Sequence, residues 1–135
     1  MGRVFFDTKV NIVDVDAAKV LTNADSGTTF IINQASAYEI TLPLMSTIDR
    51  GWNATFIIGT ANTNAVTIAN NTAEDTIVGG VAGADGGAAT HAETAVDEVV
   101  FISGAVLGDR VTIVSNGVNY FVSGYAADVA HITVS

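Results

Sequence analysis

Two histidines are the first side chains of this sequence that could do chemistry. His91 and His131 lie far apart, and the chain has no cysteine and no His-x-x-x-His pair, so the residues that would complete a zinc site are missing. A Ser-His-Asp triad needs an exposed nucleophile, but the Gly-x-Ser-x-Gly turn that presents one is absent. We therefore expect both histidines to be polar or packing residues, and we predict no catalytic residue.

Carboxylates are the second group of side chains that could do chemistry. Asp14 and Asp16 fall on one face of a strand, where a carboxylate pair could hydrolyse a glycoside. Any exposed strand edge can carry such a pair, and we interpret it as protection against edge-to-edge aggregation. Four further acids offer the oxygen ligands that Ca²⁺ takes, although their spacing matches no EF-hand: Asp75, Asp85, Glu93 and Asp97. We predict no structural metal.

The stretch Gly79–Asp97 is rich in glycine and alanine. No Gly-Lys-Ser/Thr sequence and no G-x-G-x-x-G fingerprint is present, so a phosphate-binding loop and a bound cofactor are not expected. Small residues leave little side-chain area to bury, and the stretch exceeds the usual loop length of about 12–15 residues. We expect a mobile, solvent-facing excursion or an arm between subunits.

The elements that must position these residues are strands. Threonine, valine and isoleucine recur in short runs separated by Asn, Gly, Asp and Ser, and runs with helical period are missing. The predicted strands are 4–15, 19–21, 28–33, 38–42, 54–59, 65–68, 76–78, 99–102, 110–115, 118–123 and 131–134. Asn116-Gly117 predicts a type I′ hairpin turn that pairs Ile113 with Tyr120.

Length and strand spacing define the expected architecture. A chain of 135 residues is the size of one domain. Many short strands predict an all-β, single-domain antiparallel sandwich or barrel with jelly-roll or Greek-key connections. We divide the chain into an N-terminal strand or arm, residues 1–19, and a sandwich domain, residues 20–135. No internal repeat supports a β-solenoid.

Charge excludes some partners and favours others. Fourteen acids against five bases give a net charge of −9, which is the wrong sign for binding nucleic acid. No apolar run approaches the length of about 20 residues that a membrane span needs. Only 14% of the residues are charged, against about 25% in typical soluble domains. Part of the surface is therefore expected to be covered by another subunit.

Aromatic residues suggest where a partner binds. Trp52 precedes an apolar strand and could stack on a sugar, but an anchor in the core or at a subunit interface is the commoner role. The same two roles, sugar stacking and an anchor in the core or at an interface, are considered for Tyr125. Near the N-terminus, Val4 precedes Phe5 and Phe6, which would point to opposite faces of a strand. One of these two rings is then available to a partner.

Three blocks of sequence resemble a known family. They are "LTNADSGTTFIINQASAYEITLP" (21–43), "GWNATFIIG" (51–59) and "GDRVTIVSNGVNYFVSG" (108–124), followed by the terminal "HITVS". In that order they resemble the small head decoration, or cement, proteins of tailed bacteriophages. The resemblance covers roughly residues 20–135 and implies an all-β protein, usually trimeric, that docks on the outer face of the expanded capsid.

The resemblance implies a structural role. The chain would be a non-enzymatic virion protein made in the host cytoplasm, a homotrimer bound to the major capsid protein, with no nucleic-acid or membrane partner. The residues expected at the capsid or subunit interface are Val4, Phe5, Phe6, Trp52 and Tyr125. The alternative is a receptor- or carbohydrate-binding module of a tail fibre, with Trp52, Tyr120, Tyr125 and the Asn-rich segment 60–71 as its sugar-binding surface.

Overall fold

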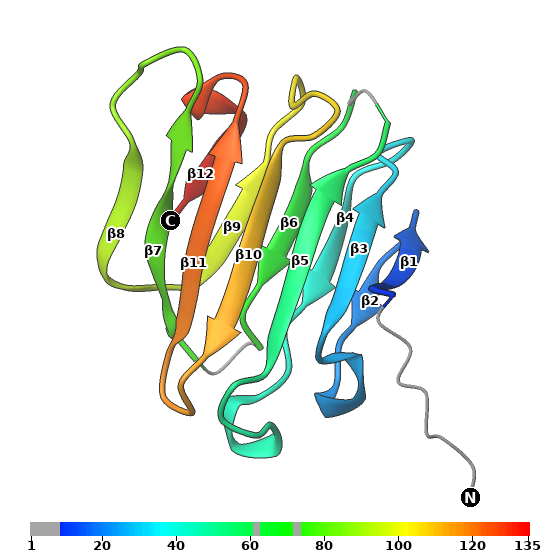
Figure 1. The fold of residues 1–135 in the computed structure, drawn as a ribbon, viewed down its shortest axis with the longest axis vertical. Helices are drawn as coiled ribbons and strands as arrows, with labels where there is room; N and C mark the ends of the chain where they lie inside the picture. The colour runs from blue at the N-terminus through cyan, green and yellow to red at the C-terminus, as the bar shows by residue number, and fades with distance from the viewer. Residues whose placement is uncertain (1–8, 61–62, 72–73) are drawn as a thin grey trace, which may run out of the picture.

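Two β-sheets stacked face to face form the molecule (Figure 1). A computed structural model describes residues 9–60, 63–71 and 74–135 of the chain. The seven-stranded sheet has the order β1 (Asn11–Val15), β3 (Thr28–Ile32), β5 (Asn53–Ile58), β10 (Arg110–Ser115), β11 (Tyr120–Ala126), β7 (Ile77–Gly83) and β8 (Thr90–Val96). The five-stranded sheet has the order β12 (Ile132–Val134), β9 (Glu98–Phe101), β6 (Val66–Ala69), β4 (Tyr38–Thr41) and β2 (Lys19–Val20).

Alternation along the strands builds the core between the sheets. In β3 and β5 every second residue is buried, so Phe30 stacks on Phe56 with ring centroids 5.3 Å apart. Three short 3-10 helices complete the described secondary structure: η1 (Asn23–Asp25), η2 (Met45–Thr47) and η3 (Val129–His131). No helix of the described residues is long and apolar enough to cross a membrane. The all-β prediction is confirmed, and the two layers are those of a sandwich.

The antiparallel prediction is wrong, because both sheets are mixed. The chain changes sheet after each of its first five strands, so β1, β3 and β5 run parallel in one sheet and β2, β4 and β6 run parallel in the other. This is the coil of a β-solenoid. Its turns differ in length: Asn11 pairs with Thr28, whereas Thr28 pairs with Ala54. Unequal turns leave no repeat in the sequence.

The second half of the chain pairs differently. β10 and β11 form an antiparallel hairpin in the seven-stranded sheet, and β9 and β12 pair antiparallel in the five-stranded sheet. The four strands β9 to β12 thus form one long hairpin, with β10 and β11 in the seven-stranded sheet and β9 and β12 in the five-stranded sheet. β7 runs parallel to β11 and antiparallel to β8.

Both edge strands near the N-terminus belong to the sandwich. β1 pairs with β3 and β2 pairs with β4, so the described part of segment 1–19 is continuous with the domain assigned to residues 20–135. Val4, Phe5 and Phe6 lie outside the described residues. The first described residue, Lys9, stands two positions before β1.

For Gly79–Asp97 we predicted a mobile, solvent-facing excursion or an arm between subunits, and the prediction of a loop is wrong, although residues 84–89 are exposed. This stretch contains most of β7 and all of β8, which pair with a register shift between Ile77 and Gly79. Gly79 has φ +117°, and a Cβ there would collide with the carbonyl oxygen of Val122 on β11. The glycine therefore allows the backbones of β7 and β11 to approach closely, which is a structural use that composition alone does not reveal.

The β10–β11 turn is longer than predicted. Ser115 pairs with Tyr120 and Ile113 with Val122, so residues 116–119 form a four-residue loop. Since no non-glycine residue described has a positive φ, Asn116 does not adopt the type I′ conformation. Its Oδ1 instead accepts hydrogen bonds from the backbone N–H groups of Val118 and Asn119, at 2.9 and 2.8 Å.

Replacing Gly117 by valine is expected to lower the free energy of unfolding by about 1 kcal/mol or more, because a β-branched residue resists positive φ. Gly117 has φ +91°, and a Cβ there would meet only the Arg50 Cβ, at 3.9 Å. The cost is therefore backbone strain and not collision. Urea unfolding measures it, with Val118→Ala in the same loop as the control. Equal stability of Gly117→Val and the wild type would contradict the strained turn.

Candidate functional site

A histidine and an aspartate meet at the end of the sandwich where β10 begins. Asp109 is only 2% exposed, and its Oδ2 lies 2.8 Å from the Nδ1 of His131 in η3. The same carboxylate accepts hydrogen bonds from the backbone N–H groups of Val106, at 2.9 Å, and Ala127, at 2.8 Å. Asp109 thus joins the β9–β10 loop, the end of β11 and η3.

This pair has two members of a triad but no nucleophile. Among the described residues, no serine or threonine hydroxyl is hydrogen-bonded to the ring of His131. His91 lies on β8, opposite Gly80, in the other part of the seven-stranded sheet. The arrangement around Asp109 is that of a carboxylate joining three backbone segments.

The four acids considered as calcium ligands, for which no metal was predicted, do not meet at one place. Asp75 and Asp97 line a hollow of about 310 Å³ on the five-stranded sheet. Asp85 accepts a hydrogen bond from the Val129 N–H at 3.2 Å, and Glu93 lies on β8. In the described part of the chain, no group of three or more His, Cys, Asp or Glu could hold a metal ion. Asp14 and Asp16 line a different hollow, of about 350 Å³, beside Thr60.

Trp52 lies in the core and not on the surface. It is 1% exposed, its ring contacts Tyr120 edge-on at 5.7 Å, and its Nε1 donates to the carbonyl of Thr22 at 3.0 Å. The Tyr120 hydroxyl donates to the carbonyl of Pro43 at 2.7 Å. Burial, and then the charge of Glu74, raises the pKa of Tyr120 well above its usual value. Both rings are occupied within the chain, so neither can stack on a sugar or reach a partner.

Tyr38 is a second tyrosine that acts only as a donor. Its hydroxyl donates to the carbonyl oxygens of Val15, at 2.8 Å, and Asn33, at 3.0 Å. Burial, reinforced by the negative charge of Asp16, raises the pKa of Tyr38 to about 12. A phenol of that pKa stays protonated at neutral pH, so it is a structural tie and not a general base.

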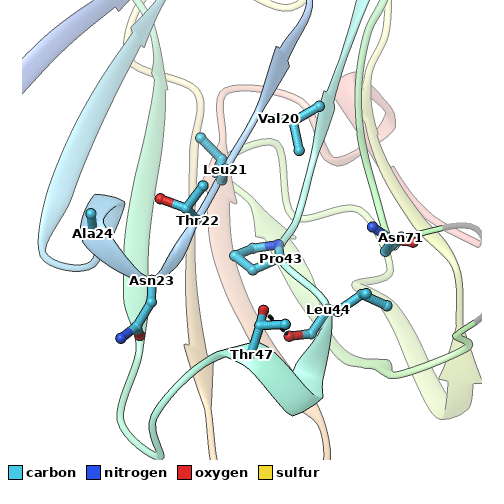
Figure 2. Close-up of a pocket in the computed structure, with 9 residues that line it drawn as sticks. All are labelled: Val20, Leu21, Thr22, Asn23, Ala24, Pro43, Leu44, Thr47 and Asn71. Atoms are coloured by element: carbon cyan, nitrogen blue, oxygen red, sulfur yellow. Dashed lines mark hydrogen bonds between the residues drawn. The ribbon is translucent and has the colours of Figure 1, made fainter.

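An apolar hollow lies where β2 ends (Figure 2). It has a volume of about 510 Å³, and none of the nine residues that line it is charged: Val20, Leu21, Thr22, Asn23, Ala24, Pro43, Leu44, Thr47 and Asn71. The Thr47 hydroxyl donates to the Leu44 carbonyl at 2.8 Å, which fixes one wall. Val20, on the edge strand β2, is 66% exposed at its rim. We call this feature the β2 hollow.

The outer face of the seven-stranded sheet carries exposed apolar side chains. Inward side chains of β3, β5, β10 and β11 are buried, so the alternate residues form rows across the outside. One row is Ile12, Thr29, Thr55, Thr112 and Ser123, and the next is Asp14, Ile31, Ile57, Arg110 and Tyr125. Four large apolar or aromatic side chains on it are 42% to 60% exposed: Ile12, Val114, Phe121 and Tyr125. We call this the open face.

Charge is nearly absent from the open face. From β1 to β7 in the sheet order, Asp14 and Arg110 are its charged residues among those described. The Arg110 guanidinium lies 5.8 Å from the ring centroid of Tyr125, within the range of a cation–π contact. Acids lie instead on the five-stranded sheet. Glu39 of β4 and Glu98 of β9 line the same hollow of about 310 Å³ as Asp75 and Asp97. The outer face of the seven-stranded sheet is therefore nearly uncharged from β1 to β7, whereas the five-stranded sheet carries acidic side chains.

Sequence reasoning identified Tyr125 as an interface candidate and missed the surface around it. The alternation within strands 28–33, 54–59 and 110–115 was a usable signal, because most of their outward positions are threonine, isoleucine or valine. No signal identified Asp109. No protein-family model matches the chain, and no curated protein matches it either.

Proposed function

We propose that this chain is a non-enzymatic structural virion protein that binds the outer surface of a tailed-phage capsid and stabilises the expanded shell. The observation that carries the proposal is the open face: a broad, nearly uncharged sheet surface with four large side chains exposed on a chain of net charge −9. Soluble proteins rarely leave such a surface uncovered unless another protein covers it. The chemically capable side chains, Asp109 and His131, are meanwhile engaged in holding the fold.

The resemblance of blocks 21–43, 51–59 and 108–124 to phage decoration proteins supports the same proposal. It implies a homotrimer and a jelly-roll-like subunit. The hairpin of β9 to β12, folded across both sheets, is the kind of unit that a jelly roll repeats, which supports this part of the proposal for the second half of the chain. The proposed partner is the major capsid protein, and the proposed location is the outer surface of the virion.

The proposed shell contact is at the end of the sandwich that carries the β2 hollow. β1 starts at Asn11, which pairs with Thr28 just after η1, and Asn23 and Ala24 of η1 line the hollow. The described chain therefore begins at this end. Val4, Phe5 and Phe6 precede it, and burying one such ring contributes about 1.5–3 kcal/mol. Three copies that bind together turn modest single contacts into tight attachment.

Deleting Met1–Phe6 tests this contact. We expect a folded, soluble chain that no longer sediments with undecorated expanded capsids, because the apolar segment is lost. A second variant, Phe5→Ser with Phe6→Ser, keeps the length of the chain. Leu107→Ser is the matched control, since Leu107 is 64% exposed in the β9–β10 loop at the opposite end of the sandwich.

Two results would contradict the proposal in different ways. If the deleted chain binds capsids with wild-type occupancy and affinity, the N-terminal contact is wrong. If the intact chain binds no expanded capsid, the decoration function is wrong.

The carbohydrate-binding alternative is not supported by the arrangement of its residues. Trp52 and Tyr120 are buried. Within the Asn-rich segment, Asn64 Nδ2 donates to the carbonyls of Gln34 and Ala35, and Asn70 is bonded to Val96 and Thr76. Of the residues named for this surface, Tyr125 alone offers an exposed ring, so no second function is proposed.

A further inference from the structure

We propose that Asn116 is a site of spontaneous modification, at which the folded chain loses the side-chain amide by attack of the next backbone nitrogen. The products carry aspartate or isoaspartate at position 116. The inference goes beyond the proposed function, because it needs neither a capsid nor a second copy of the chain. Asn116 begins the β10–β11 loop, which lies at the same end of the sandwich as η1 and η2 (Figure 1).

The reaction needs no partner except water. The Gly117 nitrogen attacks Cγ of Asn116, so an N–Cγ bond forms while the Cγ–Nδ2 bond breaks. Nδ2 leaves as ammonia and takes up the proton that the Gly117 nitrogen loses. Water then opens the cyclic imide at its side-chain carbonyl, which gives aspartate, or at its main-chain carbonyl, which gives isoaspartate. Both reacting groups belong to one chain, so the attack is intramolecular.

Glycine is the residue that leaves room for this attack. Asn116-Gly117 is the only Asn-Gly pair of the sequence. Because glycine has no Cβ, its nitrogen is uncrowded and its backbone can rotate. Gly117 is exposed, and a Cβ built on it would meet only the Cβ of Arg50, at 3.9 Å. The surroundings of Gly117 therefore do not obstruct the formation of a ring.

The loop also stabilises the charge that develops during the attack. When nitrogen adds to Cγ, negative charge moves to Oδ1 of Asn116. That oxygen accepts hydrogen bonds from the backbone N–H groups of Val118, at 2.9 Å, and Asn119, at 2.8 Å. Backbone donors of this kind form the oxyanion holes of acyl-transfer enzymes. Nδ2 donates to none of the described residues, so its departure breaks no contact with them.

One contact opposes the attack. The Gly117 N–H donates to Oγ of Ser115 at 3.0 Å, and this hydrogen bond must break before the nitrogen can react. The Ser115 hydroxyl is held in turn, because it is buried and donates to Sδ of Met45 at 3.1 Å. We therefore expect Ser115 to limit the rate at which Asn116 is modified.

Asn119 is an internal reference for Asn116, because it belongs to the same loop. The nitrogen that follows it, in Tyr120, donates to the carbonyl of Thr76 at 2.8 Å. Tyr120 is also buried, so an attack by its nitrogen would disturb the start of β11 and the core. We expect Asn119 to stay intact while Asn116 reacts.

Ageing the purified full chain at mildly alkaline pH tests the proposal. Peptide mass spectrometry follows the replacement of NH2 by OH at each asparagine, and electron-transfer fragmentation separates isoaspartate from aspartate. We expect Asn116 to convert first, with isoaspartate among the products. Gly117→Ala is expected to slow the conversion about tenfold, because a Cβ crowds the attacking nitrogen.

Ser115→Ala tests the contact that opposes the attack. It is expected to speed the conversion of Asn116 about fivefold, because the hydrogen bond that holds the Gly117 N–H is lost. Val118→Ala is the matched control, since it keeps every backbone donor of the loop, and we expect it to react as the wild type. If Ser115→Ala speeds the conversion of Asn119 equally, the whole loop has opened, and the specific role of Ser115 is wrong.

The same chain unfolded in urea supplies the reference for the folded one. If the folded chain shows no conversion when most of Asn116 has reacted in the unfolded chain, the loop blocks the attack and the proposal is overturned. Conversion of another asparagine ahead of Asn116 in the folded chain would overturn it as well.

Discussion

Replacing Asp109 by alanine is expected to lower the free energy of unfolding by about 3–5 kcal/mol, because it removes one partner of a buried, hydrogen-bonded pair. The carboxylate is 2% exposed and accepts from Val106, Ala127 and His131, so alanine removes three hydrogen bonds at one point. Guanidinium unfolding followed by the fluorescence of Trp52, which is buried, measures the change.

Asp128→Ala is the matched control for this change. Asp128 accepts a single hydrogen bond, from the Ala130 N–H at 2.8 Å, and it is exposed. Its loss is expected to cost about 1 kcal/mol, the ordinary value of an N-cap. If Asp109→Ala costs no more than Asp128→Ala, Asp109 does not join the three segments as its geometry indicates.

His131→Ala tests how much the Asp109–His131 pair contributes to stability. Removing the imidazole leaves the carboxylate two backbone donors, so this change should cost less than Asp109→Ala. The double variant should cost less than the sum of the two single changes, because the pair is then lost only once. A strictly additive result would mean that the two side chains do not interact.

Strand positions could be predicted from the sequence because alternation is a local property. The predicted strands 28–33, 38–42, 54–59 and 110–115 match β3, β4, β5 and β10 to within a residue or two. β8 was missed, since its segment Thr90–Val96 contains four alanines or threonines and a single valine and lacks a clear apolar alternation. The glycines of β7 were interpreted as flexibility, whereas Gly79 serves the close approach of β11.

Strand direction could not be predicted in the same way. Whether β3 pairs parallel with β5 depends on the path of the chain through the second sheet, and alternation within a strand carries no information about its neighbours. Because the turns of the coil differ in length, the sequence shows no repeat, and a repeat would have indicated parallel pairing. A hairpin with a strong local turn, such as β10–β11, is the case in which direction was predicted correctly although its register was displaced by two residues.

In the candidate site, too, local alternation could be predicted from the sequence and the pairing of strands could not. The open face follows from outward positions that local alternation identifies, so its composition was present in the sequence. Which side chains become neighbours on the open face depends on the strand order. Asp14 and Arg110 stand in one row only because β1 pairs with β3, β3 with β5 and β5 with β10. For the same reason no pattern connected Asp109 with His131, which lie on different connections of the chain.

Replacing Trp52 by alanine is expected to lower the free energy of unfolding by about 3–5 kcal/mol, because the change leaves a large cavity in a packed core. It also removes the edge-on contact with Tyr120 and the hydrogen bond to the Thr22 carbonyl, which lies in the wall of the β2 hollow. Trp52→Phe keeps an aromatic ring without the N–H donor, and its expected cost is about 1–2 kcal/mol. Calorimetry measures both variants, since Trp52 is the single tryptophan of the chain and its fluorescence is lost.

The comparison with Phe121→Ala decides between a core role and an interface role for Trp52. Phe121 is 47% exposed on the open face, so its loss should change subunit stability by less than about 1 kcal/mol while weakening self-association. Trp52→Phe should do the reverse, because its ring lies between the sheets and contacts no part of the open face. If Trp52→Phe instead leaves the subunit fully stable and abolishes association, Trp52 is the interface anchor that the sequence alone favoured, and its position in the core is wrong.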